Sequence, residues 1–211
     1  MVQHASRKKR LLSLIEKTKA EGIVFLSGDS HHGEIHLDEH EGFYQFWEFT
    51  SSGINQGLPA TEDQNRVGPA IAEPNFGSVE IDWKLRQVKV SVSSGSDSSI
   101  SHTLPFSQLT FADENLRTKN DLSAAVGTWE TRWGPLTLTK GEENKWSAVY
   151  ADSQNGSITL TEKEDTLSGT WQRNNRSGTC TFSISRCGNY LLGVSGSVNK
   201  PQLMNWNGWK K

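Results

Sequence analysis

The chain has 211 residues, 34% of them hydrophobic, with 19 glycines and 8 tryptophans. This length accommodates one large or two small domains, and the lean apolar content with abundant Gly and Trp favours β structure over helix. A formal net charge of −2 gives no overall attraction to nucleic acid, and no apolar run is long enough to span a membrane. The amino terminus is polar and basic and shows no signal peptide, so the cellular compartment stays open.

The first predicted element is a helix over residues 6–21, because apolar side chains recur there at helical spacing and Gly22 can end the helix. A basic run, Arg7–Arg10, lies in its first turns, and we interpret it as a solvated helix start rather than a localisation signal or a phosphate-binding patch. A continuous apolar run at 23–27, bounded by glycines, follows the helix. This run predicts a strand that is buried on both faces.

The segment after this strand carries most of the chemistry of the chain. Four of the six histidines and five acidic residues lie in one window without Lys or Arg: Asp29, His31, His32, Glu34, His36, Asp38, Glu39, His40 and Glu41. Carboxylate and imidazole together bind hard and borderline metals, and a cation would offset the repulsion among the carboxylates. The spacing alone leaves a metal centre and a solvated polar hairpin open. One form of metal centre is a mononuclear zinc site made within Asp29–His40.

A long loop containing Gly, Pro and Asn leads from this window to about Pro74. Beyond it, residues 75–83 and 86–93 each alternate apolar with polar side chains, and the residues between them are typical of a turn. We therefore predict a β-hairpin here. Few strands are available to cover the apolar strand at 23–27, so we expect residues 1–100 by themselves to leave apolar surface exposed.

The remaining sequence reads as a separate β unit. Gly-Thr-Trp at 127–129 recurs at 169–171, and alternating segments between turn residues predict about seven short antiparallel strands. We expect this meander to close as a small barrel or sandwich, which hides its edges. Its tryptophans either fill the core or form an exposed surface for sugar rings. Cys180 and Cys187 either pair locally or stay as two free thiols.

These patterns predict an α+β, mainly β protein in two units. Residues 1–106 form the first unit, residues 107–125 a linker, and residues 126–211 a Trp- and Gly-rich antiparallel β accessory domain. The second unit contains no histidine and no catalytic constellation. Candidate chemistry is therefore confined to the first unit.

One motif resembles a known family. Residues 26–34 read Leu-Ser-Gly-Asp-Ser-His-His-Gly-Glu, which is similar to the last metal-site motif of the PhoD-like (alkaline phosphatase D-like) metallophosphoesterases of the calcineurin superfamily. The resemblance continues in order through residues 48–53, 75–77 and 80–83, and it covers residues 6–95. It implies that the first unit is the carboxyl-terminal portion of that family's α/β sandwich, with one helix and few strands.

The resemblance also implies roles for two residues. Where the wider superfamily carries Gly-His-x-His, Asp29 stands at the first His position and His31 at the second. His31 is then a metal ligand and catalytic residue, and Asp29 is a second ligand or supports it. The implied cofactors are divalent or trivalent metal ions such as Fe, Ca, Zn or Mn, and the implied substrate is a phosphoester.

The same comparison predicts an incomplete site. The family's earlier ligand motifs have no counterpart before His31 in this sequence, and hydrolysis with two metals needs ligands from several strands. We expect the chain by itself not to hydrolyse phosphoesters efficiently. It is either part of a longer enzyme or a degenerate protein. In the alternative function it is a non-catalytic binding protein that uses the β domain for a glycan or protein partner.

Overall fold

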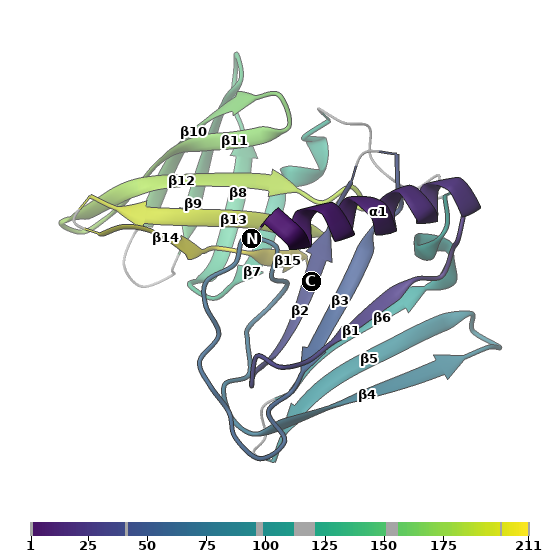
Figure 1. The fold of residues 1–211 in the computed structure, drawn as a ribbon. Coiled ribbons are helices and arrows are strands. Elements are labelled where there is room, and N and C mark those ends of the chain that lie inside the picture. Colours follow the sequence, from purple (N-terminus) through teal and green to yellow (C-terminus); the bar gives the residue numbers. More distant parts are fainter. Residues whose placement is uncertain are drawn as a thin grey trace.

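The protein is described by a computed structural model, in which two β modules lie side by side (Figure 1). The structure describes residues 2–40, 42–95, 99–111, 121–150, 156–198 and 200–210. One α-helix and many strands make the chain mainly β, as the sequence predicts. Among these residues no helix is long and apolar enough to cross a membrane.

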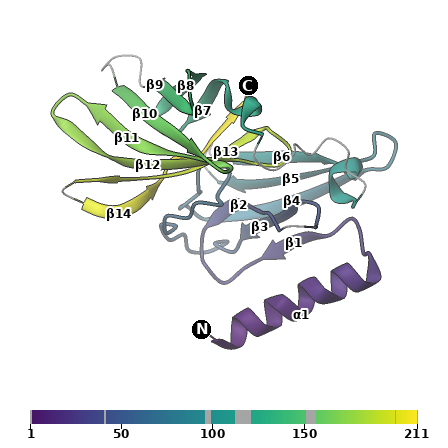
Figure 2. The ribbon, with the colours of Figure 1, turned by 90° about the horizontal axis from the view of Figure 1, so that it is seen from above.

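The amino-terminal module consists of a helix and two three-stranded sheets. Its elements are α1 (Val2–Thr18), β1 (Val24–Ser27), β2 (Gly33–Asp38), β3 (Phe46–Ser51), β4 (Asn75–Asp82), β5 (Gln87–Ser94) and β6 (Ser99–Pro105). The sheets have the orders β1-β3-β2 and β4-β5-β6, and β1 runs parallel to β3 while the other pairs are antiparallel. Figure 2 shows α1 along one side of the first sheet and the second sheet on the other side. The predicted helix and hairpin are both present.

Alternating apolar side chains hold these layers together. Trp47 and Phe49 of β3 lie beside Leu37 and Ile35 of β2 in the antiparallel register, and all four are buried. Val90 of β5 joins the same apolar cluster from the second sheet. Because side chains alternate across a strand, this pattern gives the first sheet one continuous apolar face towards the second sheet.

The expectation that the first strand is buried on both faces is wrong. β1 lies at the edge of its sheet and, within the part of the chain that the structure describes, pairs with β3 alone, and Leu26 is 66% exposed. The outer strand of the second sheet is similarly uncovered, with Val79 46% and Ile81 50% exposed. The module therefore leaves apolar surface exposed along these two edge strands, as we expect for residues 1–100 by themselves.

The carboxyl-terminal module is a closed antiparallel barrel. Its strands are β7 (Gly127–Thr131), β8 (Gly134–Lys140), β9 (Lys145–Tyr150), β10 (Gly156–Lys163), β11 (Thr166–Arg173), β12 (Arg176–Ile184), β13 (Tyr190–Ser197), β14 (Lys200–Asn205) and β15 (Gly208–Lys210). Neighbours from β7 to β13 pair in sequence, and β15 bridges β13 back to β7. Eight strands thus close the ring, while β14 adds to β13 beside β15. Of the two closures that the sequence predicts, the barrel is the one formed.

Large side chains fill the barrel. Trp129, Trp146 and Trp206 are all at most 2% exposed and belong to one apolar cluster with inward residues of every long strand. The Trp129 indole also donates a 2.9 Å hydrogen bond to the Ala125 carbonyl. These three tryptophans are therefore core residues rather than a surface for sugars. Both cysteines, one of them in this core, are free.

The ends of the predicted linker belong to the modules. Leu109, in the short 3₁₀ helix η1 (Phe106–Leu109), is buried in the amino-terminal core. Leu122 is buried in the barrel core, and so is Ala125 of the 3₁₀ helix η2 (Ser123–Ala125). Residues 112–120 of the linker lie outside the described residues.

The two modules share packing through the outer face of β13. Tyr190 and Leu192 pack against the amino-terminal core, and the Tyr190 hydroxyl lies 2.9 Å from a ring nitrogen of His102 on β6. The His102 ring stacks on Trp47 with 4.1 Å between ring centroids. Burial lowers the pKa of His102 from 6.5 to about 4. A neutral histidine is thus built into the junction between the modules.

We expect this histidine to make the protein acid-sensitive. The unfolded chain protonates His102 near pH 6.5 and the folded chain only near pH 4, so this contribution to stability is present above pH 6.5 and is lost as the pH falls through that window. One such group changes the free energy of unfolding by up to about 1.4 kcal/mol per pH unit. His102→Asn is expected to flatten this dependence in urea unfolding curves. An unchanged slope in the variant would contradict the assignment.

Candidate functional site

The predicted metal turn lies between β1 and β2, at the carboxyl end of β1. Asp29 and His31 both adopt left-handed backbone conformations, with φ of 72° and 59°. The His31 amide donates a 2.9 Å hydrogen bond to the Ser52 hydroxyl, and the His31 carbonyl accepts one of 2.7 Å from the Leu58 amide. The chain after β3 therefore fixes the turn through the backbone of His31. Left-handed residues other than Gly carry strain that often marks functional sites.

The two predicted ligands differ in their surroundings. Asp29 is exposed, whereas His31 is half-buried. The Nδ1 atom of the His31 ring is buried and has no hydrogen-bond partner in the part of the chain that the structure describes. Buried polar atoms are normally paired, so this nitrogen is free to act as a ligand donor. The turn thus offers one imidazole nitrogen and one carboxylate.

A second group of polar side chains surrounds Glu34 on β2. The Glu34 carboxylate accepts a 2.7 Å hydrogen bond from Arg66 Nε, and its other oxygen lies 3.0 Å from His32 Nε2 and 3.3 Å from His36 Nε2. Both Glu34 and Arg66 are buried. Burial alone raises the pKa of Glu34, but its hydrogen bonds outweigh this and hold the pKa at about 2. Burial lowers the pKa of His36, yet the interaction with Glu34 prevails and raises it above 6.5. This group is a buried ion-pair network.

Cations from outside the window pair with two of its acidic residues, Glu34 and Asp38. Arg66 pairs with Glu34, and Lys8 of α1 lies 2.6 Å from Asp38 at the end of β2. The structure thus supplies, from two distant segments, charge that the sequence predicts would come from a metal. No signal within the window could identify these partners, because pairing across the fold is decided by tertiary contacts. Glu41 lies outside the described residues.

The described residues contain no group of three or more His, Cys, Asp or Glu side chains that could hold a metal ion. Most of the window is instead divided among the turn, the Glu34 network and the Lys8–Asp38 pair, which His40 joins at 3.1 Å. Glu39 accepts hydrogen bonds from the Gln45 side chain and from the Arg186 amide. For the described residues, a zinc site formed by Asp29–His40 alone therefore finds no support. Asp29 and His31 fit part of a coordination shell, and a complete one requires further ligands.

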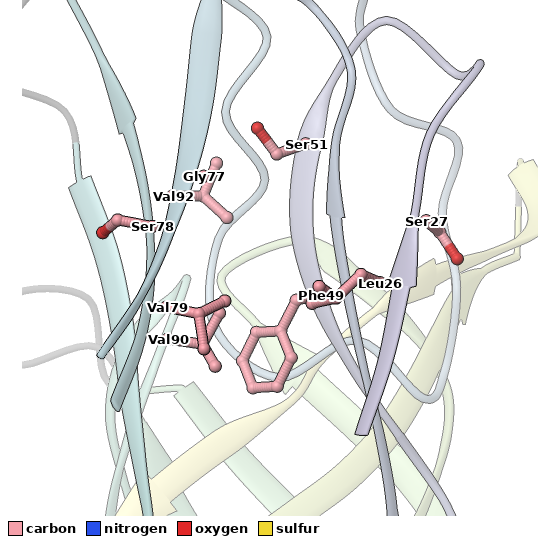
Figure 3. A pocket seen from close by; sticks show the side chains of 9 residues that line it. All are labelled: Leu26, Ser27, Phe49, Ser51, Gly77, Ser78, Val79, Val90 and Val92. Carbon is pink, nitrogen blue, oxygen red and sulfur yellow. The ribbon is translucent and has the colours of Figure 1, made fainter. Parts of the chain in front are cut away.

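An apolar groove of about 190 Å³ opens between the two sheets beside β1 (Figure 3). Leu26 and Phe49 point towards Val79 and Val90 across it. None of its lining residues is ionisable; they are Leu26, Ser27, Phe49, Ser51, Gly77, Ser78, Val79, Val90 and Val92. The groove can take apolar side chains, and its three serine hydroxyls have no ionisable side chain beside them in the lining that could serve as their base.

Comparison of the chain with protein-family models, with curated proteins and with solved structures finds no match. A function for this chain is therefore inferred from the arrangement of its own residues. In that arrangement the turn at Asp29–His31 is the strongest candidate for chemistry, because it joins an unpaired ligand atom to an unpaired sheet edge.

Proposed function

We propose that the amino-terminal module is part of a metal-dependent phosphoester hydrolase of the PhoD-like type. In this proposal it is the last portion of an α/β metallophosphatase sandwich, and the barrel is an accessory domain. His31 and Asp29 hold a metal ion together with ligands from strands outside the module. The observation that carries the proposal is the edge of β1, which has no partner strand among the described residues and leads directly into a turn where a buried His31 nitrogen likewise has no partner among them.

β1 lies at the edge of the first sheet, where it forms the parallel pair of that sheet with β3. Parallel sheets are normally covered on both faces, and exposed edges are normally protected by charge, Pro or a bulge. β1 has the sequence Val-Phe-Leu-Ser and none of these protections. A strand added at this edge would continue the first sheet and would bring its own end next to the Asp29–His31 turn.

The inner face of the second sheet supports the same conclusion. In the register of β4 and β5, Val79 is paired with the buried Val90 and Ile81 is paired with Val88, so the four side chains lie on one face of the sheet. Val79 and Ile81 are nevertheless about half exposed. The apolar groove lies between them and β1. Apolar side chains of an added strand would fill the groove and cover this face, which explains why the sequence places Val and Ile there.

The chemistry of the turn suits a hydrolytic metal. An imidazole with a carboxylate suits divalent or trivalent ions such as Fe, Zn or Mn, and Ca through the oxygens. When bound, such an ion activates water and offsets the charge of a phosphoester. In this proposal the metal ion is bound by the Nδ1 atom of His31 and by the carboxylate of Asp29. The Ser52 hydroxyl accepts a hydrogen bond from the His31 amide and so holds the turn in position.

The test is to read the gene upstream of Met1 and to co-express any ligand-bearing polypeptide found there with this chain. We expect the purified assembly to contain transition metal and to hydrolyse bis(p-nitrophenyl) phosphate, and the chain by itself to do neither. His31→Ala is expected to lower metal affinity by at least about 10-fold, measured by elemental analysis after dialysis. His40→Ala is the matched control and should retain metal.

Two outcomes contradict the proposal. One is an in-frame stop directly upstream with no separate polypeptide that carries Asp and His ligands. The other is an assembly whose metal content and hydrolysis are the same with His31→Ala as with the unchanged chain.

A further inference from the structure

A second cavity, of about 340 Å³, lies where the two modules meet. It is lined by four consecutive residues of the loop before β4 and by two residues of the barrel: Glu62, Asp63, Gln64, Asn65, Val194 and Asn205. Five of these six side chains carry an oxygen atom, and none carries an imidazole or a thiol. The cavity is therefore rich in the atoms that hard cations prefer.

Hydrogen bonds attach this loop firmly to the barrel. The Glu62 carboxylate accepts bonds of 2.7 and 2.8 Å from Arg132, and a further 2.8 Å bond from the Asn205 amide. The Asn207 side chain donates to the Gln64 carbonyl at 3.0 Å. The lining is thus held by contacts on both sides before any ligand binds, which lowers the entropic cost of binding.

One atom in this lining is unexplained by the protein itself. Asn205 is only 4% exposed, and its side-chain Oδ1 is buried without a hydrogen-bond partner among the described residues. Leaving such a group unsatisfied costs about 1–3 kcal/mol. Asn205 is one of the residues that line the cavity, and a ligand bound there can supply the partner that this oxygen lacks.

The charges of the lining favour a cation as that ligand. Glu62 is already paired with Arg132, whereas the Asp63 carboxylate accepts, among the described residues, one hydrogen bond through one oxygen, from the Asn65 amide at 2.7 Å. The remaining Asp63 oxygen is an anionic donor, and the amide carbonyls add neutral ones. Calcium accepts six to eight oxygen ligands in flexible geometry, including Asn and Gln carbonyls and water, whereas magnesium demands a rigid octahedron.

We propose that this cavity binds a hydrated calcium ion, with the Asp63 carboxylate and the Asn205 Oδ1 as protein ligands. The ion would connect the loop of the amino-terminal module to β14 of the barrel. The proposal is independent of the hydrolytic metal, because it uses different residues and only oxygen donors.

Calcium titration of the full chain after treatment with a chelator tests the proposal. We expect calcium to raise the melting temperature in a saturable way and magnesium to do so much more weakly. Asp63→Asn is expected to weaken calcium binding at least about 10-fold, since affinity follows the number of charged ligands. Glu142→Gln, an exposed change in the barrel hairpin between β8 and β9, should leave it unchanged.

Asn205→Asp distinguishes a ligand from a structural amide. If Oδ1 binds the ion, the added charge makes calcium binding tighter, and calcium restores whatever stability the buried carboxylate removes. His31→Ala should keep the whole calcium response, because His31 is not part of this cavity. The calcium proposal can therefore fail or succeed independently of the hydrolytic proposal. No saturable response in the unchanged chain, or an equal response with Asp63→Asn, would overturn the proposal and leave water as the partner of Oδ1.

Discussion

Replacing Arg66 with Met is expected to lower the free energy of unfolding by about 3–5 kcal/mol, because it leaves a buried carboxylate without its cation. The Arg66 side chain is 7% exposed and lies 2.7 Å from Glu34, whose side chain is 10% exposed. Urea unfolding near neutral pH measures the change. Lys8→Met is the matched control, since it breaks an ion pair with Asp38 whose partners are 56% and 35% exposed and should cost at most about 1 kcal/mol.

Acid titration gives an independent check on this network. In the unchanged protein the pKa of Glu34 is lowered from 4.5 to about 2, so its stabilising contribution is present above pH 4.5 and is lost as the pH falls towards 2. Removing Arg66 raises the folded pKa, and the stability difference between the two proteins should therefore shrink as the pH falls through this window. Equal costs for the Arg66 and Lys8 variants would contradict the buried network.

Trp129→Ala is expected to lower the free energy of unfolding by about 3–5 kcal/mol through the cavity that it creates. Trp129 is 0% exposed in the barrel core and also loses its hydrogen bond to the Ala125 carbonyl. Trp83→Ala makes the same chemical change at a side chain that is 75% exposed and contacts only one ring, that of Phe106, among the aromatic side chains described. We expect this control to cost less than about 1 kcal/mol.

The outcome of this pair bears on the role of the barrel. If the barrel interior is filled by side chains, the free energy of unfolding falls by a large amount in Trp129→Ala and by a small amount in Trp83→Ala. Similar small costs at both positions, measured by denaturant unfolding followed by circular dichroism, would mean that the barrel interior tolerates a void.

Local patterns predicted most of the elements correctly. The hairpin of β4 and β5 follows from alternation at Val79 and Ile81, and the barrel strands follow from the same period between turn residues. This works because side-chain alternation is a property of each strand by itself. The candidate turn is local as well, since Asp29 and His31 are two residues apart and directly follow an apolar strand.

The sequence patterns did not predict strands β2, β3 and β6, and the other shortcomings concern contacts between distant segments. The apolar run at β1 predicts burial on both faces, but burial depends on how many neighbouring strands are present, and β1 has one. The acidic window gives no sign that Lys8 and Arg66 reach Asp38 and Glu34 from other parts of the fold.

By itself the sequence determined the strand periods, the turns, the mainly β character and the position of the Asp29–His31 turn. Only the tertiary structure decided that the meander closes through β15 as a barrel, that β1 keeps a free edge, and that Asn205 leaves an oxygen unpaired between the modules. The physical reason is the same throughout. Backbone conformation is set by neighbours along the chain, whereas closure, burial and ion pairing depend on which distant segments meet.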